Sequence, residues 1–267
     1  MKRSIALLAF LIPLFAGAQS SLLNELMATS CSGDVTAASE NIREFEDDLK
    51  NRKRGTSDFT FLKAIFTKTQ QKFLKHYSQY TDLHEIFSTG KYDCLTATGL
   101  FSVLLSDLGF QYRIIETNYH IFLLVQTEKG EVLLETTDRF NGFVAGKDDI
   151  ENRLGSYKKN LLTADAGAGK VYHTYHFSLY QDVHPNQLTG LLFYNQAVKA
   201  FNNKELLTSA ELLNKSRALY DSPRVAELAV MITESVLDSN LSEDTKLLIL
   251  KRYKNYWEQR SRLMAIR

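Results

Sequence analysis

The segment from Cys94 to Gly109 constrains the fold more than any other part of the sequence. Apolar residues occur on nearly every side of a helix here, between Asp93, a residue type that caps helix N-termini, and Gly109, one that ends helices. Such a helix has no polar face to turn to water. The sequence therefore predicts a central, buried helix with the rest of the chain packed around it.

The residues on either side of this helix show two different periodicities. Alternating or strand-rich patterns predict strands after it, at 111–116, 120–127, 131–135 and 171–180. Helical spacing predicts helices at 35–50, 58–80, 83–87, 188–201, 207–219, 224–237 and 242–264. Helices, then strands, then helices indicate an α+β domain, in which the buried helix packs on an antiparallel sheet, followed by an all-α domain.

The first 18 residues have the composition of a signal peptide. Lys2 and Arg3 precede a short apolar run that ends in Ala-Gly-Ala at Ala18, an A-x-A cleavage site. We therefore expect cleavage after Ala18 and a periplasmic or secreted protein without a membrane span; an uncleaved anchor helix is the alternative, although the run is shorter than the roughly 20 apolar residues that span a bilayer. The mature chain then divides into an N-terminal helical leader (19–55), the α+β domain (56–184) and the helical domain (185–267).

Charge and cysteine content narrow the classes of partner and site. The 32 Lys and Arg residues nearly balance the 31 Asp and Glu residues, so no strong field favours nucleic acid, and a partner must be recognised by shape and chemistry. Cys31 and Cys94 are too few for a disulfide framework, but they could pair with each other in an exported protein. We expect no cofactor and no metal, because His173 and His176 would point to opposite faces of a strand.

Cys94 is the candidate nucleophile, because the first turn of a helix favours the thiolate form of cysteine. His120, at the start of a strand, is the candidate base, and the following hairpin returns acidic residues beside it. A two-residue hairpin loop within 128–130 places His120 on the same sheet face as Glu135 and Thr137. A three-residue loop with Gly130 in the left-handed conformation places Asp138 opposite His120 instead, and the residues alone leave both registers open.

These residues resemble the core of the transglutaminase-like superfamily, relatives of papain-type cysteine proteases. The family typically has Gly-x-Cys on a helix, Leu-Gly-(Ile/Leu)-Pro after it, His-Ala-Trp-x-Glu-Val on a strand and Asp-Pro-Thr on the next. The residues that carry the resemblance here are Gly90, four positions before Cys94, together with Cys94, Leu108, Gly109, His120, Val125 and Glu135-Thr136-Thr137. Tyr92 stands in place of the family's Gly, Phe122 in place of its Trp and Glu135 in place of its Asp, and no Pro follows Gly109.

The resemblance implies a Cys-His-acid triad that acts on an amide bond in a peptide or in cell-wall peptide. Cys94 would be the nucleophile, His120 the general base and acid, and Glu135 the orienting acid, with Asp138 in reserve. The backbone N–H of Cys94 would stabilise the oxyanion, and Tyr92 is a candidate second donor. We therefore expect an exported cysteine hydrolase or acyltransferase; the departures from the family pattern favour the alternative of a non-catalytic binding module.

The C-terminal helices resemble one degenerate tetratricopeptide unit. The resemblance rests on Tyr194, Asn195, Ala197, Phe201, Ala210, Lys215, Ala218 and Pro223. It implies a possible protein partner on these helices, in addition to a peptide or protein substrate. A plain helical bundle is the alternative interpretation.

Overall fold

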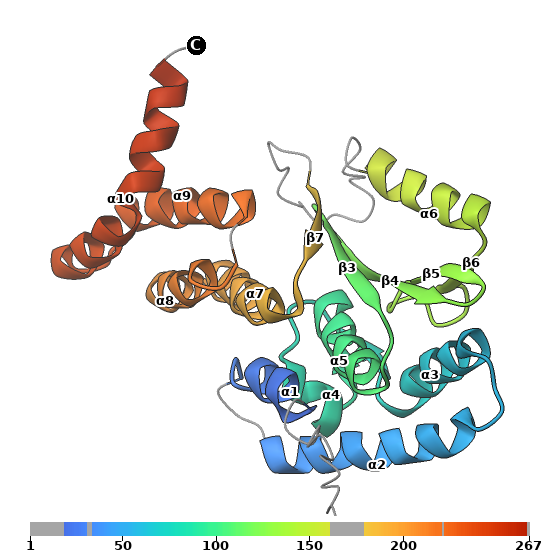
Figure 1. Cartoon of the computed structure of the whole chain (residues 1–267). Helices are drawn as coiled ribbons and strands as arrows, with labels where there is room; N and C mark the ends of the chain where they lie inside the picture. The colour runs from blue at the N-terminus through green and yellow to red at the C-terminus, as the bar shows by residue number, and fades with distance from the viewer. Residues whose placement is uncertain (1–18, 31–33, 161–178, 221, 266–267) are drawn as a thin grey trace, which may run out of the picture.

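The structure is a computed structural model that describes residues 19–30, 34–160, 179–220 and 222–265 (Figure 1). The signal peptide, Cys31, both candidate metal histidines and most of the strand expected at 171–180 lie outside the described residues.

The described residues form ten α-helices, one short 3-10 helix and seven strands. The helices are α1 (Gln19–Met27), α2 (Val35–Lys53), α3 (Asp58–Lys72), α4 (Leu83–Ser88), α5 (Cys94–Asp107), α6 (Lys147–Asn160), η1 (Pro185–Gln187), α7 (Leu188–Asn202), α8 (Leu206–Arg217), α9 (Pro223–Leu237) and α10 (Glu243–Ala265). The strands are β1 (His76–Tyr77), β2 (Lys91–Tyr92), β3 (Tyr112–Thr117), β4 (Ile121–Thr127), β5 (Gly130–Leu134), β6 (Phe143–Ala145) and β7 (Tyr180–Val183).

The main sheet has five antiparallel strands in the order β6-β5-β4-β3-β7. In Figure 1 α5 lies against one face and α6 near the other. Side chains alternate between the two faces, so Ile121 and Leu123 of β4 join the core around α5, whereas Phe122 and Leu124 join a smaller core with α6. The mixed α/β architecture with an antiparallel sheet is the one expected from the sequence, and the sheet is covered on both faces.

Helix α5 is the buried centre of the molecule, as its sequence predicted. Each of the eleven residues from Leu95 to Leu105 is buried. At Gly99 an added Cβ would lie 3.4 Å from the Leu26 side chain, so the small residue lets α1 pack closely on α5. A fully buried leucine stabilises the folded state by about 1.5–3 kcal/mol relative to an exposed one. The buried residues of this helix therefore stabilise the packing of the elements around it.

The structure corrects the expected helix at 58–80 and adds two helices. Helix α3 ends at Lys72, because the next residues pair in parallel as β1 with β2. Gly90 allows this approach: its φ is 72°, and a Cβ there would lie 2.5 Å from the Lys75 side chain. The added helices, α1 and α6, were not expected from the sequence.

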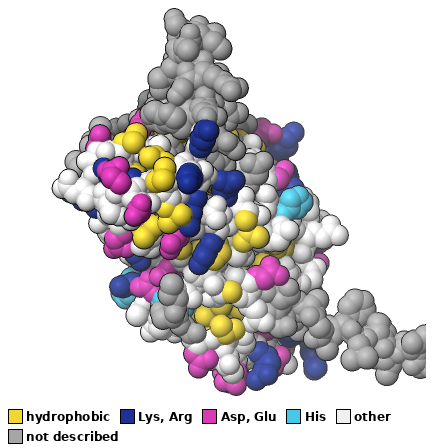
Figure 2. All heavy atoms as spheres, turned by 90° about the vertical axis from the view of Figure 1, so that its left-hand side faces the viewer, with side chains coloured by type: hydrophobic (Ala, Val, Ile, Leu, Met, Phe, Trp, Pro, Cys, Tyr) yellow, Lys and Arg dark blue, Asp and Glu magenta, His cyan; other side chains and the backbone are white. Residues whose placement is uncertain are grey.

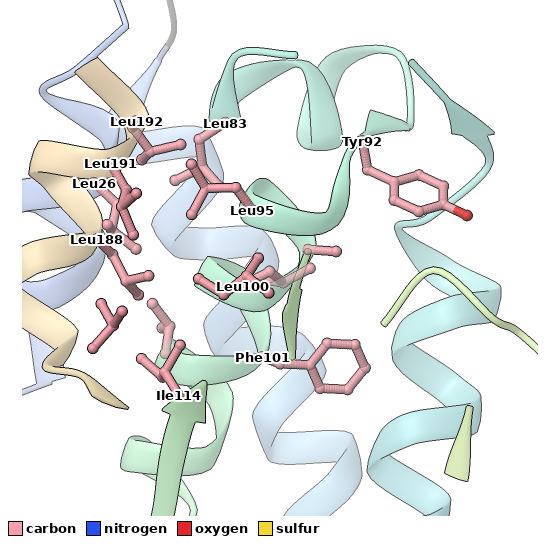
Figure 3. Packing of buried hydrophobic residues seen from close by; sticks show 14 of the residues in the cluster. Leu26, Leu83, Tyr92, Leu95, Leu100, Phe101, Ile114, Leu188, Leu191 and Leu192 are labelled. Atoms are coloured by element: carbon pink, nitrogen blue, oxygen red, sulfur yellow. The ribbon is translucent and has the colours of Figure 1, made fainter. Parts of the chain in front are cut away.

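The C-terminal helices share a core with the rest of the molecule. Figure 3 shows leucines of α7 facing leucines of α1, α4 and α5. The labelled residues are Leu188, Leu191 and Leu192 of α7, Leu26 of α1, Leu83 of α4 and Leu95 of α5. This region is therefore packed against the Cys94 helix rather than tethered to it. No helix in the described part of the chain is long and apolar enough to cross a membrane.

Candidate active site

Cys94 is the first residue of α5, at the end capped by Asp93. The Asp93 carboxylate accepts hydrogen bonds from the Thr96 N–H at 2.8 Å and from the Thr81 N–H at 3.3 Å. Burial raises the pKa of Asp93 above its usual value, although these hydrogen bonds oppose the rise. Cys94 itself is half-buried and carries a free thiol. The cap therefore fixes the helix start, and with it the position of the sulfur.

His120 is the last residue of the tight turn between β3 and β4 and directly precedes β4. The Thr117 N–H donates to the His120 carbonyl at 2.7 Å, and the His120 N–H donates to the Thr117 hydroxyl at 3.1 Å. Burial lowers the pKa of the imidazole, but hydrogen bonds with Cys94 and Glu135 outweigh that effect and raise it to about 10. Glu135 contacts Nε2 of the ring, and the Cys94 thiol is a second hydrogen-bond partner of the same ring.

Glu135 is the acidic residue whose carboxylate contacts the His120 ring in the structure. The β4–β5 register pairs Thr127 with Gly130, so the loop has two residues, Glu128 and Lys129. This is the register that puts His120 and Glu135 on one sheet face, and it resolves the alternative that the sequence left open.

The Glu135 carboxylate is buried, and each of its oxygens has partners. Oε1 accepts from the backbone N–H of Thr137 at 3.0 Å and from its hydroxyl at 2.6 Å. Oε2 contacts Nε2 of His120 and accepts from the Tyr157 hydroxyl at 2.6 Å. Burial raises the pKa of the carboxyl group, but these hydrogen bonds, led by that of His120, lower it to about 2. The acid is therefore held ionised beside the imidazole.

Tyr157 is a site residue that the sequence analysis missed. It comes from α6, and its ring centroid lies 5.3 Å from that of His120 and 5.2 Å from that of Phe122. Burial and the Glu135 carboxylate raise the pKa of its hydroxyl, which therefore stays protonated and donates. Ile150, Leu154 and Tyr157 form an apolar helical stripe in an otherwise polar segment, and this pattern could have revealed the helix but not its contact with Glu135.

Two expected site residues take other positions. Asp138, the reserve acid, pairs with Arg153 at 3.4 Å and accepts from the Asn141 N–H at 2.9 Å. Tyr92 is buried in β2 with its ring edge-on to Tyr77, and it is absent from the described residues that line the cleft at Cys94. The structure therefore joins Cys94, His120 and Glu135. Asp138 lines the smaller cavity beside His120 and Glu135, but its carboxylate is paired with Arg153, and Tyr92 lines neither cavity.

A cleft of about 480 Å³ opens onto Cys94 and His120. One wall is the first turn of α5 with the β3–β4 hairpin, a second is the 77–80 segment, and a third is formed by α7 and α9. A smaller cavity of about 300 Å³ lies on the other side of His120, next to Glu135 and Tyr157. The candidate nucleophile and base thus face a space large enough for a peptide segment.

Arg224 of α9 ties the C-terminal helices to the hairpin that presents His120. Its guanidinium donates to the backbone carbonyls of Thr117 and Asn118 and lies 3.1 Å from the Glu116 carboxylate. Tyr220 donates to the same carboxylate at 2.5 Å. No sequence pattern indicated this buried cluster, because its members are about a hundred residues apart and meet only in the folded chain.

Within the described residues, no group of three or more His, Cys, Asp or Glu side chains is placed to hold a metal ion. No protein-family model matches the sequence, and neither a curated protein nor a solved structure matches it.

Proposed function

We propose that this chain is an exported cysteine hydrolase or acyltransferase with a transglutaminase-like core, acting on an amide bond. The observation that carries the proposal is the connected set of Cys94, His120 and Glu135, in which the imidazole lies between a free thiol and a buried carboxylate. A Cys-bearing helix packed on an antiparallel sheet, with the His directly before β4 and the acid directly after β5, supports the resemblance to that superfamily.

The chemistry follows from the roles that these groups can fill. The Cys94 thiol transfers its proton to His120, and the sulfur attacks the amide carbonyl carbon. The carbon–nitrogen bond then breaks, and His120 returns the proton to the departing amine, which leaves a thioester on Cys94. Water resolves the thioester in hydrolysis, and a second amine resolves it in transfer. The raised pKa of His120 favours the imidazolium form that the first step creates.

Glu135 orients the imidazole and stabilises its positive charge. The carboxylate is suited to this role because Thr137 and Tyr157 hold both of its oxygens. The Cys94 backbone N–H, at the start of α5, is the first oxyanion donor of the proposal. The sequence suggested Tyr92 as the second, but Tyr92 is not among the described residues that line the cleft, and we propose Gln79, on the 77–80 wall, in its place.

Cys94→Ala and His120→Ala test the proposal in the mature protein. The substrate is a mixture of blocked hexapeptide amides, with cleavage followed by mass spectrometry and thiol labelling by iodoacetamide at pH 6. We expect cleavage by the wild type, its loss in both variants, and labelling at Cys94 that His120→Ala slows at least about tenfold. Cys31→Ala is the matched control and should retain both activities. Cleavage that survives Cys94→Ala would overturn the proposal.

Export is tested separately by the N-terminus of the mature protein. Expression with the complete leader should give an extracytoplasmic protein that begins at Gln19, as read by intact mass. A protein that keeps residues 1–18 would favour the anchored alternative.

A second candidate function is a non-catalytic module that holds a protein partner. Leu237, Leu247 and Leu248, on the C-terminal helices, are about half exposed. Figure 2 shows apolar side chains among charged ones of both signs on the side of the molecule that these helices form. This candidate gains support if Cys94→Ala and Glu135→Gln leave partner binding intact and no peptide or amine substrate is ever turned over.

A further inference from the structure

The third wall of the cleft consists of one face from each of two C-terminal helices. The lining residues of α7 recur at spacings of three and four, which place them on a single helical face, and those of α9 do the same. From α7 they include Leu191, Tyr194, Val198 and Phe201, and from α9 Leu228 and Met231. These two helices therefore contribute apolar side chains, interspersed with Asn195, Asn202, Arg224 and Glu227, to the cleft that opens onto the candidate nucleophile.

Three of these side chains are only half-buried in the cleft. Val198, Phe201 and Met231 retain exposed surface, whereas Leu191 and Leu228 are fully buried beneath them. Apolar surface left open in a cleft gains free energy when a ligand covers it, at about 25 cal/mol per Å². The half-buried group, which we name the apolar shelf, is suited to an aliphatic or aromatic side chain.

The charged residues that line the cleft disfavour the binding of a ligand that carries a carboxylate. Asp93, Glu116 and Glu227 contribute carboxylates, whereas Arg224 contributes a guanidinium and His120 an imidazolium that is already paired with Glu135. That guanidinium is already bound to Glu116 and to two backbone carbonyls, so its charge is largely neutralised before a ligand arrives. A ligand carboxylate would lose its hydration here without a matching cation, which is costly in a partly dry site.

The other two walls of the cleft supply aromatic side chains. Tyr77 and Tyr80 line the 77–80 wall and Tyr119 lines the hairpin wall, and Tyr80 has a left-handed backbone conformation, with a φ of 57°. Bulky residues with positive φ are uncommon and tend to occur at functional sites. Tyrosine combines a large contact area with a polar end, as a surface that contacts a peptide requires.

We infer that the cleft binds a peptide segment with a large apolar or aromatic side chain, which lies on the shelf of Val198, Phe201 and Met231, and that it rejects a carboxylate at this position. The inference deepens the proposed function, because it names the substrate class of the same site. It assigns the C-terminal helices a direct part in substrate selection.

Binding to the Cys94→Ala protein tests this inference without requiring turnover. The probes are blocked hexapeptide amides based on alanine, in which Phe, Lys or Glu replaces Ala at each position in turn. At one position Phe should bind about 10- to 200-fold more tightly than Ala, as is typical for an apolar pocket, whereas Glu should bind more weakly than Ala. Lys should bind at least as well as Ala.

Met231→Lys in the same background places a cation on the shelf. It should lower the Phe-to-Glu ratio at that position at least about tenfold, whereas Leu237→Lys, on the exposed part of the same helix, should leave the ratio unchanged. Phe201→Ala removes apolar surface without adding charge, and it should lower the preference for Phe over Ala even if Met231→Lys fails to fold.

The inference and the proposed function can fail independently. Equal or tighter binding of Glu peptides, no measurable binding of any probe, or a Phe201→Ala protein with an unchanged Phe preference would overturn the inference, whether or not the wild type cleaves peptides. Selective binding of Phe peptides that the wild type never cleaves would support the inference and overturn the proposed enzymatic function.

Discussion

Two buried glutamates near His120 have similar surroundings but different consequences. Glu135 is 3% exposed and Glu116 is 1% exposed. Each accepts a hydrogen bond from a tyrosine, Tyr157 for Glu135 and Tyr220 for Glu116, and each has a cationic partner. Burial of a carboxylate is costly unless it is paired and hydrogen-bonded, and both sites meet that requirement.

The two glutamate sites differ in the cationic residue that pairs with the carboxylate. Glu135 faces His120, whose charge can change and whose ring also has the Cys94 thiol as a hydrogen-bond partner. Glu116 faces Arg224, which stays charged at every accessible pH and binds the carbonyls of the hairpin. The Glu135 site is therefore suited to move a proton, whereas the Glu116 site is suited to hold a backbone turn in place. The chemical role of each of these buried carboxylates therefore depends on the cationic residue with which it pairs.

Among substitutions at these two glutamates and their partners, Glu135→Gln is expected to cause the largest change in activity. A glutamine of the same shape cannot stabilise the imidazolium, so kcat/KM for the peptide substrate should fall by about 10⁴-fold, or ~5.5 kcal/mol in the transition state. Glu116→Gln should leave kcat/KM of the folded protein within about tenfold of wild type. Steady-state kinetics on both variants, with the folded fraction checked by circular dichroism, makes the comparison. Equal losses in both would mean that the two sites do not differ in role.

The pH dependence of stability should separate the same two sites. The Glu135 pKa is lowered from 4.5 to about 2. The contribution of this carboxylate to the free energy of unfolding is therefore complete above pH 4.5 and is lost as pH falls through 2. The His120 pKa is raised from 6.5 to about 10, so its contribution is complete below pH 6.5 and is lost as pH rises through 10.

Urea unfolding between pH 6 and 10 measures this loss directly. The difference in unfolding free energy between wild type and Glu135→Gln should shrink as pH rises, because His120 loses its charge. The difference between wild type and Arg224→Gln should stay constant over this range, since the guanidinium keeps its charge. Parallel curves for the two variants would remove the distinction.

Arg224→Ala should destabilise the protein by about 3–5 kcal/mol, because it leaves the Glu116 carboxylate buried without its charged partner. Replacing both, as Glu116→Leu with Arg224→Leu, should recover most of that loss, since neither charge is then buried. Urea unfolding monitored by fluorescence measures both variants. If the double variant is as unstable as the single one, the hydrogen bonds to the hairpin carbonyls, and not the ion pair, are the main contribution of Arg224.

Local sequence patterns predicted the parts of this comparison that depend on near neighbours. The apolar run after Cys94 predicted α5 and its cap, and the short loop after Thr127 limited the acid to two choices, of which the register selects Glu135. Helix α3 was predicted too long because its last residues have helical spacing, yet their backbone pairs with β2. Pairing between distant segments overrode the local preference there.

Partners that arrive from distant helices could not be predicted in this way. Tyr157 comes from a polar helix of weak periodicity, and Arg224 lies in a region whose pattern indicates only helical packing. Nothing in either local sequence specifies a carboxylate as the partner. The candidate triad could be predicted, because its order along the chain resembles a known pattern. Tyr157 and Arg224, which hold the triad residues or their hairpin in position, could not be predicted from the sequence.

Tyr157→Phe and Tyr220→Phe provide the finest test of the difference between the two glutamates. Each removes one hydroxyl that donates to a buried carboxylate, and a hydrogen bond to a charged group contributes about 1.5–3 kcal/mol. At the Glu116 site this loss should appear only in the unfolding free energy. At the Glu135 site it should also raise the pKa of Glu135, so the acid limb of the kcat/KM profile should move to higher pH while the alkaline limb moves little. Because both variants lose the same group from the same kind of contact, a shifted acid limb in Tyr157→Phe alone would identify Tyr157 as a positioning residue for the acid, whereas unshifted profiles in both would reduce it to a structural contact like Tyr220.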